Sequence, residues 1–238
     1  MKLLVSPRDL EEAKSVIRGN ADIVDVKNPK EGSLGANFPW VIRAIKELVD
    51  KEGGNDMEMS AAIGDFYYKP GTASLAALGA ASVGADYIKI GLFKIKTREE
   101  AIDLLSGVVK AVKGFDPTKK VVSAFYSDYK RINSISPFEI AEIGKEVDID
   151  VSMVDTGIKD GKTTFEFLSE DELTTFVSES KALGLETALA GSFTFEDIPA
   201  LKRIAPDILG VRSMVCGGDR NSQVQEELVT ELRRKVSE

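Results

Sequence analysis

Short apolar runs alternate with longer segments of helical periodicity along the whole chain. The short runs are typical of buried strands, and the longer segments carry apolar residues three or four positions apart. This order predicts parallel strands connected by helices. The predicted strands are residues 3–5, 21–27, 57–63, 87–92, 121–125, 151–154, 187–190 and 208–211. The predicted helices are residues 9–18, 39–49, 75–83, 97–112, 136–147, 170–183, 195–204 and 223–236.

The number of strand and helix units indicates the fold class. About eight such units in a chain of 238 residues match the size of a TIM barrel. The alternative is a doubly wound open sheet, which usually has fewer strands and carries a glycine-rich fingerprint after the first one. Here Ser6, Pro7, Arg8 and Asp9 stand at that place. We therefore expect an α/β protein whose residues 1–238 form a single-domain (β/α)8 TIM barrel.

Composition restricts the chemistry more than it restricts the fold. The chain has no histidine, which excludes imidazole bases, histidine triads and most transition-metal sites. A net charge of −8 argues against a nucleic-acid partner, and the single cysteine, Cys216, excludes an intrachain disulfide. No signal peptide is recognised, and no apolar run reaches the ~18 residues of a membrane span. We expect a cytoplasmic protein that binds no metal and no membrane. Because barrels commonly associate, we expect it to form a homo-oligomer.

Charged residues stand at the ends of three predicted strands, where TIM-barrel enzymes place their working groups. In the second strand, Asp25 and Lys27 alternate with valines, so both are expected to point into the barrel. Lys89 lies between two isoleucines of the fourth strand, and Asp155 ends the sixth strand, with Lys159 close behind. Two carboxylates and up to three lysines are therefore predicted to meet at the mouth of the barrel.

Such a lysine cluster has a physical reason to be reactive. Burial and a neighbouring ammonium both lower the pKa of a lysine and free the lone pair that attacks a carbonyl. A nearby carboxylate opposes that shift, but it can position the lysine and relay protons. The spacing leaves open which lysine is the nucleophile. It also leaves open the alternative that the charges form only an internal ion-pair network.

Two loops after the last strands are candidates for phosphate binding, because barrels often bind phosphate there through backbone N–H groups. Glycine allows close backbone approach, and an arginine adds a charged fork. The candidate residues are Gly191, Ser192, Arg212, Gly217 and Gly218, with Arg220 as the alternative arginine. The polar loop at residues 30–37 could hold a second phosphate.

Other candidates are weaker. Trp40 lies beside the apolar stripe of the helix at 39–49 and is expected to pack against the protein rather than stack on a ligand. Asp65 and Lys69 follow the third strand. They could line the mouth of the barrel, or they could equally be solvated charges of a surface loop. Cys216 has no histidine to activate it, so we expect it to take no part in catalysis.

Five motifs together resemble the (5-formylfuran-3-yl)methyl phosphate synthase family, and the similarity runs in order along the whole chain. The motifs are DVKNPKEGSLGA at 25–36, DYIKIGL at 86–92, DTGIKDGK at 155–162, ALAGS at 188–192 and GGDR at 217–220. The first of them alone is long enough to be specific.

The resemblance implies a TIM-barrel lyase of methanofuran biosynthesis that needs no cofactor. Such an enzyme converts two molecules of glyceraldehyde 3-phosphate into the furan aldehyde phosphate, with release of phosphate and water. In that family the lysine that matches Lys27 forms the Schiff base, and the lysine that matches Lys89 transfers protons. Asp25, Asp155 and Lys159 match supporting positions.

Two other classes of function remain as alternatives. One is different barrel chemistry, either an ordinary class I aldolase or an enzyme with the D-x-K-x-x-D pattern of orotidine-monophosphate-decarboxylase-like barrels. The second pattern fails here, because its last position is Lys30. The other class is a binding protein that holds a phosphorylated ligand without turnover.

Overall fold

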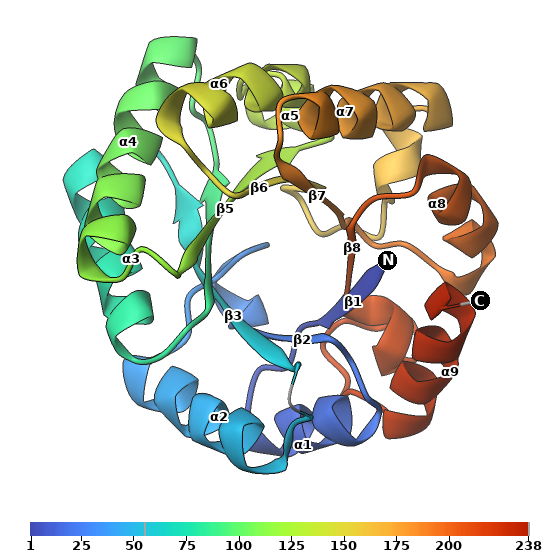
Figure 1. Ribbon diagram of the computed structural model, residues 1–238. Coiled ribbons are helices and arrows are strands. Elements are labelled where there is room, and N and C mark those ends of the chain that lie inside the picture. The colour runs from blue at the N-terminus through green and yellow to red at the C-terminus, as the bar shows by residue number, and fades with distance from the viewer. Residues whose placement is uncertain (55, 238) are drawn as a thin grey trace.

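The chain folds into a closed barrel of parallel strands, seen along its axis in Figure 1. The computed structural model describes residues 1–54 and 56–237. Each strand pairs with the next in sequence order, and β8 pairs with β1 to close the barrel. The strands are β1 (Lys2–Val5), β2 (Ile23–Val26), β3 (Glu58–Phe66), β4 (Tyr87–Leu92), β5 (Lys120–Tyr126), β6 (Val151–Asp155), β7 (Glu186–Leu189) and β8 (Ile208–Val211). The predicted (β/α)8 TIM barrel is confirmed.

The helices form a ring around the barrel (Figure 1). They are α1 (Leu10–Arg18), α2 (Pro39–Glu52), α3 (Pro70–Ser82), α4 (Arg98–Phe115), α5 (Tyr129–Ile132), α6 (Ile140–Val147), α7 (Glu170–Ala182), α8 (Ile198–Ile204) and α9 (Glu226–Ser237). None of the helices in the described residues is both long and apolar enough to cross a membrane.

Side-chain alternation along the strands divides the apolar residues into two cores. On β4, Ile88 and Ile90 belong to the larger cluster between the strands and the helices, whereas Tyr87 belongs to a smaller cluster inside the barrel. Val122 and Ala124 of β5 also belong to the inner cluster. Toward the carboxyl ends of the strands, polar and charged side chains join the interior. The alternation that builds the barrel therefore also supplies its polar mouth.

Two of the differences between the structure and the sequence predictions have a clear physical reason. Helix α3 begins at Pro70 rather than at residue 75, because proline is well suited to the first turn of a helix. The expectation that Trp40 packs against the protein is wrong, since it is 67% exposed and stacks on the likewise exposed Phe38, with ring centroids 4.6 Å apart. Trp40 is two residues, about 200° of helix rotation, from the buried Ile42, so it faces outward.

A buried ion pair ties the closing strand of the barrel to the first helix. Arg212, directly after β8, donates to both carboxylate oxygens of Glu12 on α1, at 2.8 and 3.2 Å. Both side chains are almost completely buried. Arg212 also donates to the Ser6 carbonyl at 2.6 Å, immediately after β1. The pair therefore fastens the seam at which β1 and β8 meet.

We expect Glu12→Ala to destabilise the protein by about 3–5 kcal/mol, because the substitution leaves the Arg212 guanidinium buried without its counter-ion. Glu11→Ala is the matched control on the same helix, since the Glu11 side chain is 75% exposed and its pair with Lys14 contributes at most about 1 kcal/mol. Urea unfolding of both variants measures the difference. Equal free energies of unfolding for the two variants would show that the buried pair does not stabilise the seam.

Candidate active site

The charged residues predicted to meet at the mouth of the barrel do meet there. A cavity of about 610 Å³ at the carboxyl ends of the strands is lined by Lys27, Lys89, Asp155 and Lys159. Asp25 is fully buried and is joined to the site through an ion pair with Lys89. The inward direction of Asp25 and Lys27 follows from strand alternation, because their valine neighbours lie in the outer core.

Lys89 and Asp25 form a buried ion pair across the barrel. The Lys89 ammonium donates to Asp25 Oδ2 at 2.6 Å, and Ser6 Oγ donates to the same oxygen at 2.7 Å. Burial by itself would raise the pKa of Asp25, but the positive charges of Lys89 and Lys27 outweigh it and hold this pKa below its ordinary value. Asp25 is therefore ionised at neutral pH.

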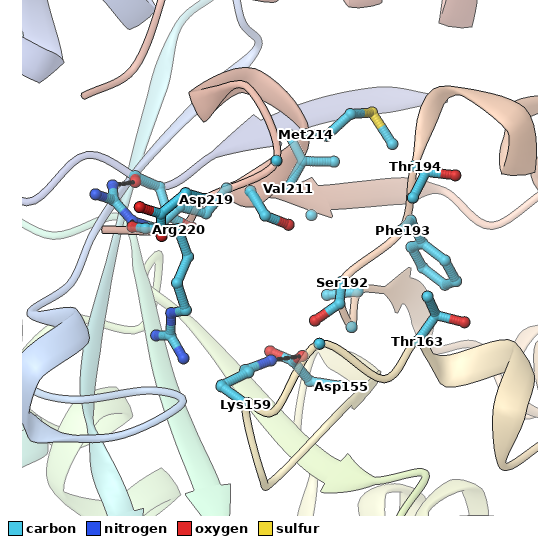
Figure 2. A pocket seen from close by; sticks show the side chains of 18 of the residues that line it. Asp155, Lys159, Thr163, Ser192, Phe193, Thr194, Val211, Met214, Asp219 and Arg220 are labelled. Atoms are coloured by element: carbon cyan, nitrogen blue, oxygen red, sulfur yellow. Dashed lines mark hydrogen bonds and ion pairs between the residues drawn. The ribbon is translucent and has the colours of Figure 1, made fainter. Parts of the chain in front are cut away.

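A second ion pair lies on the β6 side of the cavity, where Figure 2 shows Lys159 folded back onto Asp155. Lys159 Nζ donates to Asp155 Oδ1 at 2.5 Å and to Thr156 Oγ1 at 2.8 Å. Burial alone would raise the pKa of Asp155, but the charges of Lys159 and Lys27 lower it by more. The net pKa lies below its ordinary value, so the carboxylate stays charged. Both carboxylates of the site thus already neutralise a lysine.

Lys27 is the lysine without such a partner. Its side chain makes no hydrogen bond or ion pair with the described residues, and only 7% of the residue is exposed. Burial, followed by the nearby Lys89 charge, lowers the pKa of Lys27 to about 7, although Asp155 and Asp25 pull it upward. Near neutral pH much of this amine is uncharged, so it can attack a carbonyl carbon.

The sequence left the place of Asp65 open and missed its partner, Tyr126; the structure brings the two together at the mouth. Tyr126, the last residue of β5, donates a hydrogen bond to Asp65, which also accepts from the Leu34 amide at 3.1 Å. Burial raises the pKa of both Asp65 and Tyr126. Gly91 on β4 makes room for them, because a Cβ there would collide with the Tyr126 hydroxyl. Inward alternation from Val122 could have identified Tyr126, but the predicted strand ended one residue earlier.

The predicted phosphate-binding glycines line the same cavity. Gly191, Gly217 and Gly218 have φ values of 115°, 68° and 95°, and Ser192 has a φ of 57°. These positive φ values suit glycine and turn the loops sharply at the cavity wall. Both loops therefore bring backbone close to the lysine cluster.

The two candidate arginines have different roles in the structure. Arg212 uses all five N–H donors on protein acceptors: Glu12 twice, and the carbonyls of Ser6, Arg220 and Ser222. It reaches a phosphate only by giving up such a contact. Arg220 extends into the cavity near Lys159 (Figure 2), and among the described residues its guanidinium donates only to the Gly32 carbonyl, at 3.2 Å.

The loop at 30–37 is largely satisfied within the protein. The Leu34 amide is bonded to Asp65, and Ser33 Oγ donates to the Thr156 carbonyl at 2.8 Å. The backbone N–H of Asn28 donates to the Gly35 carbonyl at 2.9 Å and so closes the loop on itself. These groups support the mouth of the barrel, so they are not free to bind a second phosphate.

Solved structures of low sequence identity share this fold. KGPDC from Streptococcus mutans superposes with a TM-score of 0.65 at 12% identity, covering 99% of this chain and 97% of that one. A 3-hexulose-6-phosphate synthase has a TM-score of 0.61 at 20% identity and covers 99% and 100%. At these identities the comparison supports the barrel fold alone.

Curated relatives found by sequence are far more similar to this chain than the solved structures are. A relative from Methanosarcina acetivorans is 62% identical over 98% of this chain and 97% of its own length. One from Archaeoglobus fulgidus is 54% identical, with 99% of both chains covered. Both are named (5-formylfuran-3-yl)methyl phosphate synthase. The family model described as 4-HFC-P synthase matches residues 3–233. With the barrel and its lysine cluster in place, these matches show that the chain belongs to the 4-HFC-P synthase family.

Proposed function

We propose that this protein joins two molecules of glyceraldehyde 3-phosphate into (5-formylfuran-3-yl)methyl phosphate, with release of phosphate and water, as a carbon–oxygen lyase of methanofuran biosynthesis. The names of the curated relatives support the product. The observation that carries the chemistry is the buried Lys27 amine, which has a lowered pKa and no counter-ion among the described residues.

Lys27 forms the Schiff base. Its neutral amine attacks the aldehyde carbon of one triose, and loss of water gives an iminium. The iminium draws electrons from the neighbouring carbon and makes its proton acidic, so that a base can remove it. The resulting enamine expels the phosphate from the next carbon or attacks the second aldehyde. Ring closure and further loss of water give the aromatic furan, and hydrolysis returns the free amine.

Lys89 transfers protons in these steps, and Asp25 keeps it in position. The ion pair at 2.6 Å holds the ammonium at the cavity wall, close enough to Lys27 for its charge to act on that amine. Asp155 and Lys159 line the cavity at the end of β6, where their fixed charges orient an anionic substrate. Catalysis is thus divided between one free lysine and two lysines that are held by carboxylates.

The substrate phosphate binds between the two glycine loops. Gly191 and Ser192 supply backbone N–H donors for the anion from the loop after β7. The backbone amides of Gly217 and Gly218 donate to the Ser213 carbonyl, so these two glycines shape the loop that carries Arg220. Arg220 supplies the charge, because its guanidinium extends into the cavity and has donors to spare. Arg212 holds the loop that carries Arg220 and the second pair of glycines, and it is available to the phosphate only through rearrangement.

The decisive experiment combines trapping with product analysis. We expect borohydride treatment with glyceraldehyde 3-phosphate to add a reduced triose to Lys27, detected by peptide mass spectrometry, together with released phosphate and a furan ultraviolet band. Lys27→Arg should abolish all three signals, because a guanidinium keeps the charge but forms no imine. Lys30→Arg, three residues away in the exposed part of the loop, should leave them unchanged.

Each other outcome points to a named alternative. An adduct without phosphate release or a furan band would indicate an ordinary aldolase. No adduct and no turnover would return the lysines to a binding site or an internal ion-pair network. A fully active Lys27→Arg variant would refute the Schiff-base assignment.

The rate of adduct formation should rise with pH through a midpoint near 7, the pKa of Lys27, and level off above it. Below that pH the amine is protonated and has no lone pair, whereas an ordinary lysine reaches its midpoint only near 10.4. Lys89→Met should move the midpoint upward, because it removes a neighbouring positive charge. Initial trapping rates between pH 5.5 and 10 measure both curves, and a wild-type midpoint above 9 would contradict the lowered pKa.

Arg220→Ala should raise the KM for glyceraldehyde 3-phosphate about tenfold to a hundredfold, as expected for loss of a charge-assisted hydrogen bond to phosphate. It should also weaken competitive inhibition by inorganic phosphate. Arg203→Ala is the control, since Arg203 is exposed on α8 and paired with Glu170. Steady-state kinetics at constant ionic strength separate the two, and equal KM values would remove Arg220 from the phosphate site.

A further inference from the structure

Five polar residues form a continuous buried chain from the helix layer to the lysine cluster. In order, they are Glu12, Arg212, Ser6, Asp25 and Lys89, and each is at most 6% exposed. Every link is a hydrogen bond of 2.6 to 2.8 Å: from Arg212 to Glu12 and to the Ser6 carbonyl, then from Ser6 Oγ and Lys89 to Asp25. Ser6 is the middle link, and the functions proposed above give it no role.

The backbone around Ser6 is held on every side. The Ser6 amide donates to the Val211 carbonyl at 3.1 Å, and the Ser6 carbonyl accepts from Arg212 at 2.6 Å. Pro7 follows with a fixed φ, and its carbonyl accepts from the amide of Lys27 at 3.2 Å. The Ser6 hydroxyl is thus presented to the site from a rigid corner of the barrel seam.

The two donors to Asp25 converge on one oxygen. Ser6 Oγ and Lys89 Nζ both donate to Oδ2, at 2.7 and 2.6 Å. The other oxygen, Oδ1, is buried and has no hydrogen-bond partner among the described residues. An unpaired carboxylate oxygen in such a place is costly, so its persistence beside the reactive lysines calls for a function.

We propose that Ser6 is a positioning residue, one that locks the Asp25 carboxylate so that Oδ2 stays on Lys89 and Oδ1 remains its single open acceptor. This inference rests on the proposed role of Lys89 in proton transfer. Without the Ser6 hydroxyl, the carboxylate can rotate about its Cβ–Cγ bond and Lys89 follows it. Ser6 also lines the cavity, so it sits at the boundary between substrate and ion pair.

Other serines of the barrel show that a buried hydroxyl need not be bonded. Ser60 on β3 and Ser123 on β5 are completely buried, and within the described part of the chain their hydroxyls have no partner. Ser123 therefore offers a control in which a buried hydroxyl is deleted without loss of a hydrogen bond. The contrast separates the effect of the Ser6 bond from that of removing any buried oxygen.

We expect Ser6→Ala to lower kcat roughly tenfold or more, with KM changed less than about twofold, because a hydrogen bond to a charged group is lost. The acid limb of the kcat profile should stay near pH 7, because Lys27 sets it and makes no hydrogen bond to Ser6, so the loss appears in kcat and not in the midpoint. Ser6→Thr retains the hydroxyl and should recover most of the activity. Ser123→Ala should match the wild type in kcat and in pH profile.

Three results would overturn the inference. One is a Ser6→Ala variant with the kcat of Ser123→Ala. Another is a defect confined to KM, which would place Ser6 with the phosphate loop held by Arg212. The last is a Ser6→Thr variant that melts at the wild-type temperature yet restores nothing.

Borohydride trapping separates this inference from the proposed function. Lys27 makes no hydrogen bond to Ser6, so the adduct should still form on Lys27 in Ser6→Ala while turnover falls. If the wild-type protein forms no adduct with glyceraldehyde 3-phosphate, the proposed function fails whatever Ser6 does. If the wild type is trapped and turns over, but Ser6→Ala behaves like Ser123→Ala, the positioning role alone fails.

Discussion

Three lysines and two carboxylates share the mouth of this barrel, and the imbalance between them governs the site. An isolated charge is expensive to bury, so each carboxylate is taken up by a lysine: Asp25 by Lys89 and Asp155 by Lys159. Lys27 is the lysine left without a carboxylate. Burial and the positive charges of Lys89 and Lys159 disfavour its protonated form and so lower its pKa. The lowered pKa of Lys27 is therefore a consequence of the pairing around it, and breaking either ion pair would alter the charge state of this amine.

The pairing depends in turn on how the barrel is closed. Asp25 and Lys89 come from β2 and β4, which are not paired in the sheet. Their contact exists because both side chains point into the closed barrel, where residues of alternate strands meet. The seam between β1 and β8 is fixed by Arg212 and Glu12, and the same arginine supports the loop at residues 217–222. Stability and chemistry consequently share residues at this seam.

Much of the site was predictable, because strand alternation is a local property. Two valines flank Asp25, and two isoleucines flank Lys89, which is enough to assign the direction of each side chain. The residues that were missed, left open or given another role act through distant partners. Tyr126 and Asp65 are brought together from β5 and β3, and Arg212, expected at a phosphate, spends its donors on residues as distant in sequence as Glu12. Trp40 was wrongly expected to pack against the protein, because it is close in sequence to the apolar stripe of α2 but does not belong to the buried face of that helix.

The sequence by itself determined the alternating strands and helices, the inward direction of the charged residues, the absence of imidazole chemistry and the family. These follow from periodicity of 2.0 and 3.6 residues, from composition and from motifs, all of which are properties of short stretches of chain. Only the tertiary structure decided which carboxylate holds which lysine, and therefore that Lys27 is left without a partner. That decision depends on distances of a few ångströms between residues 64 positions apart, as for Asp25 and Lys89, and on burial that no single segment can create.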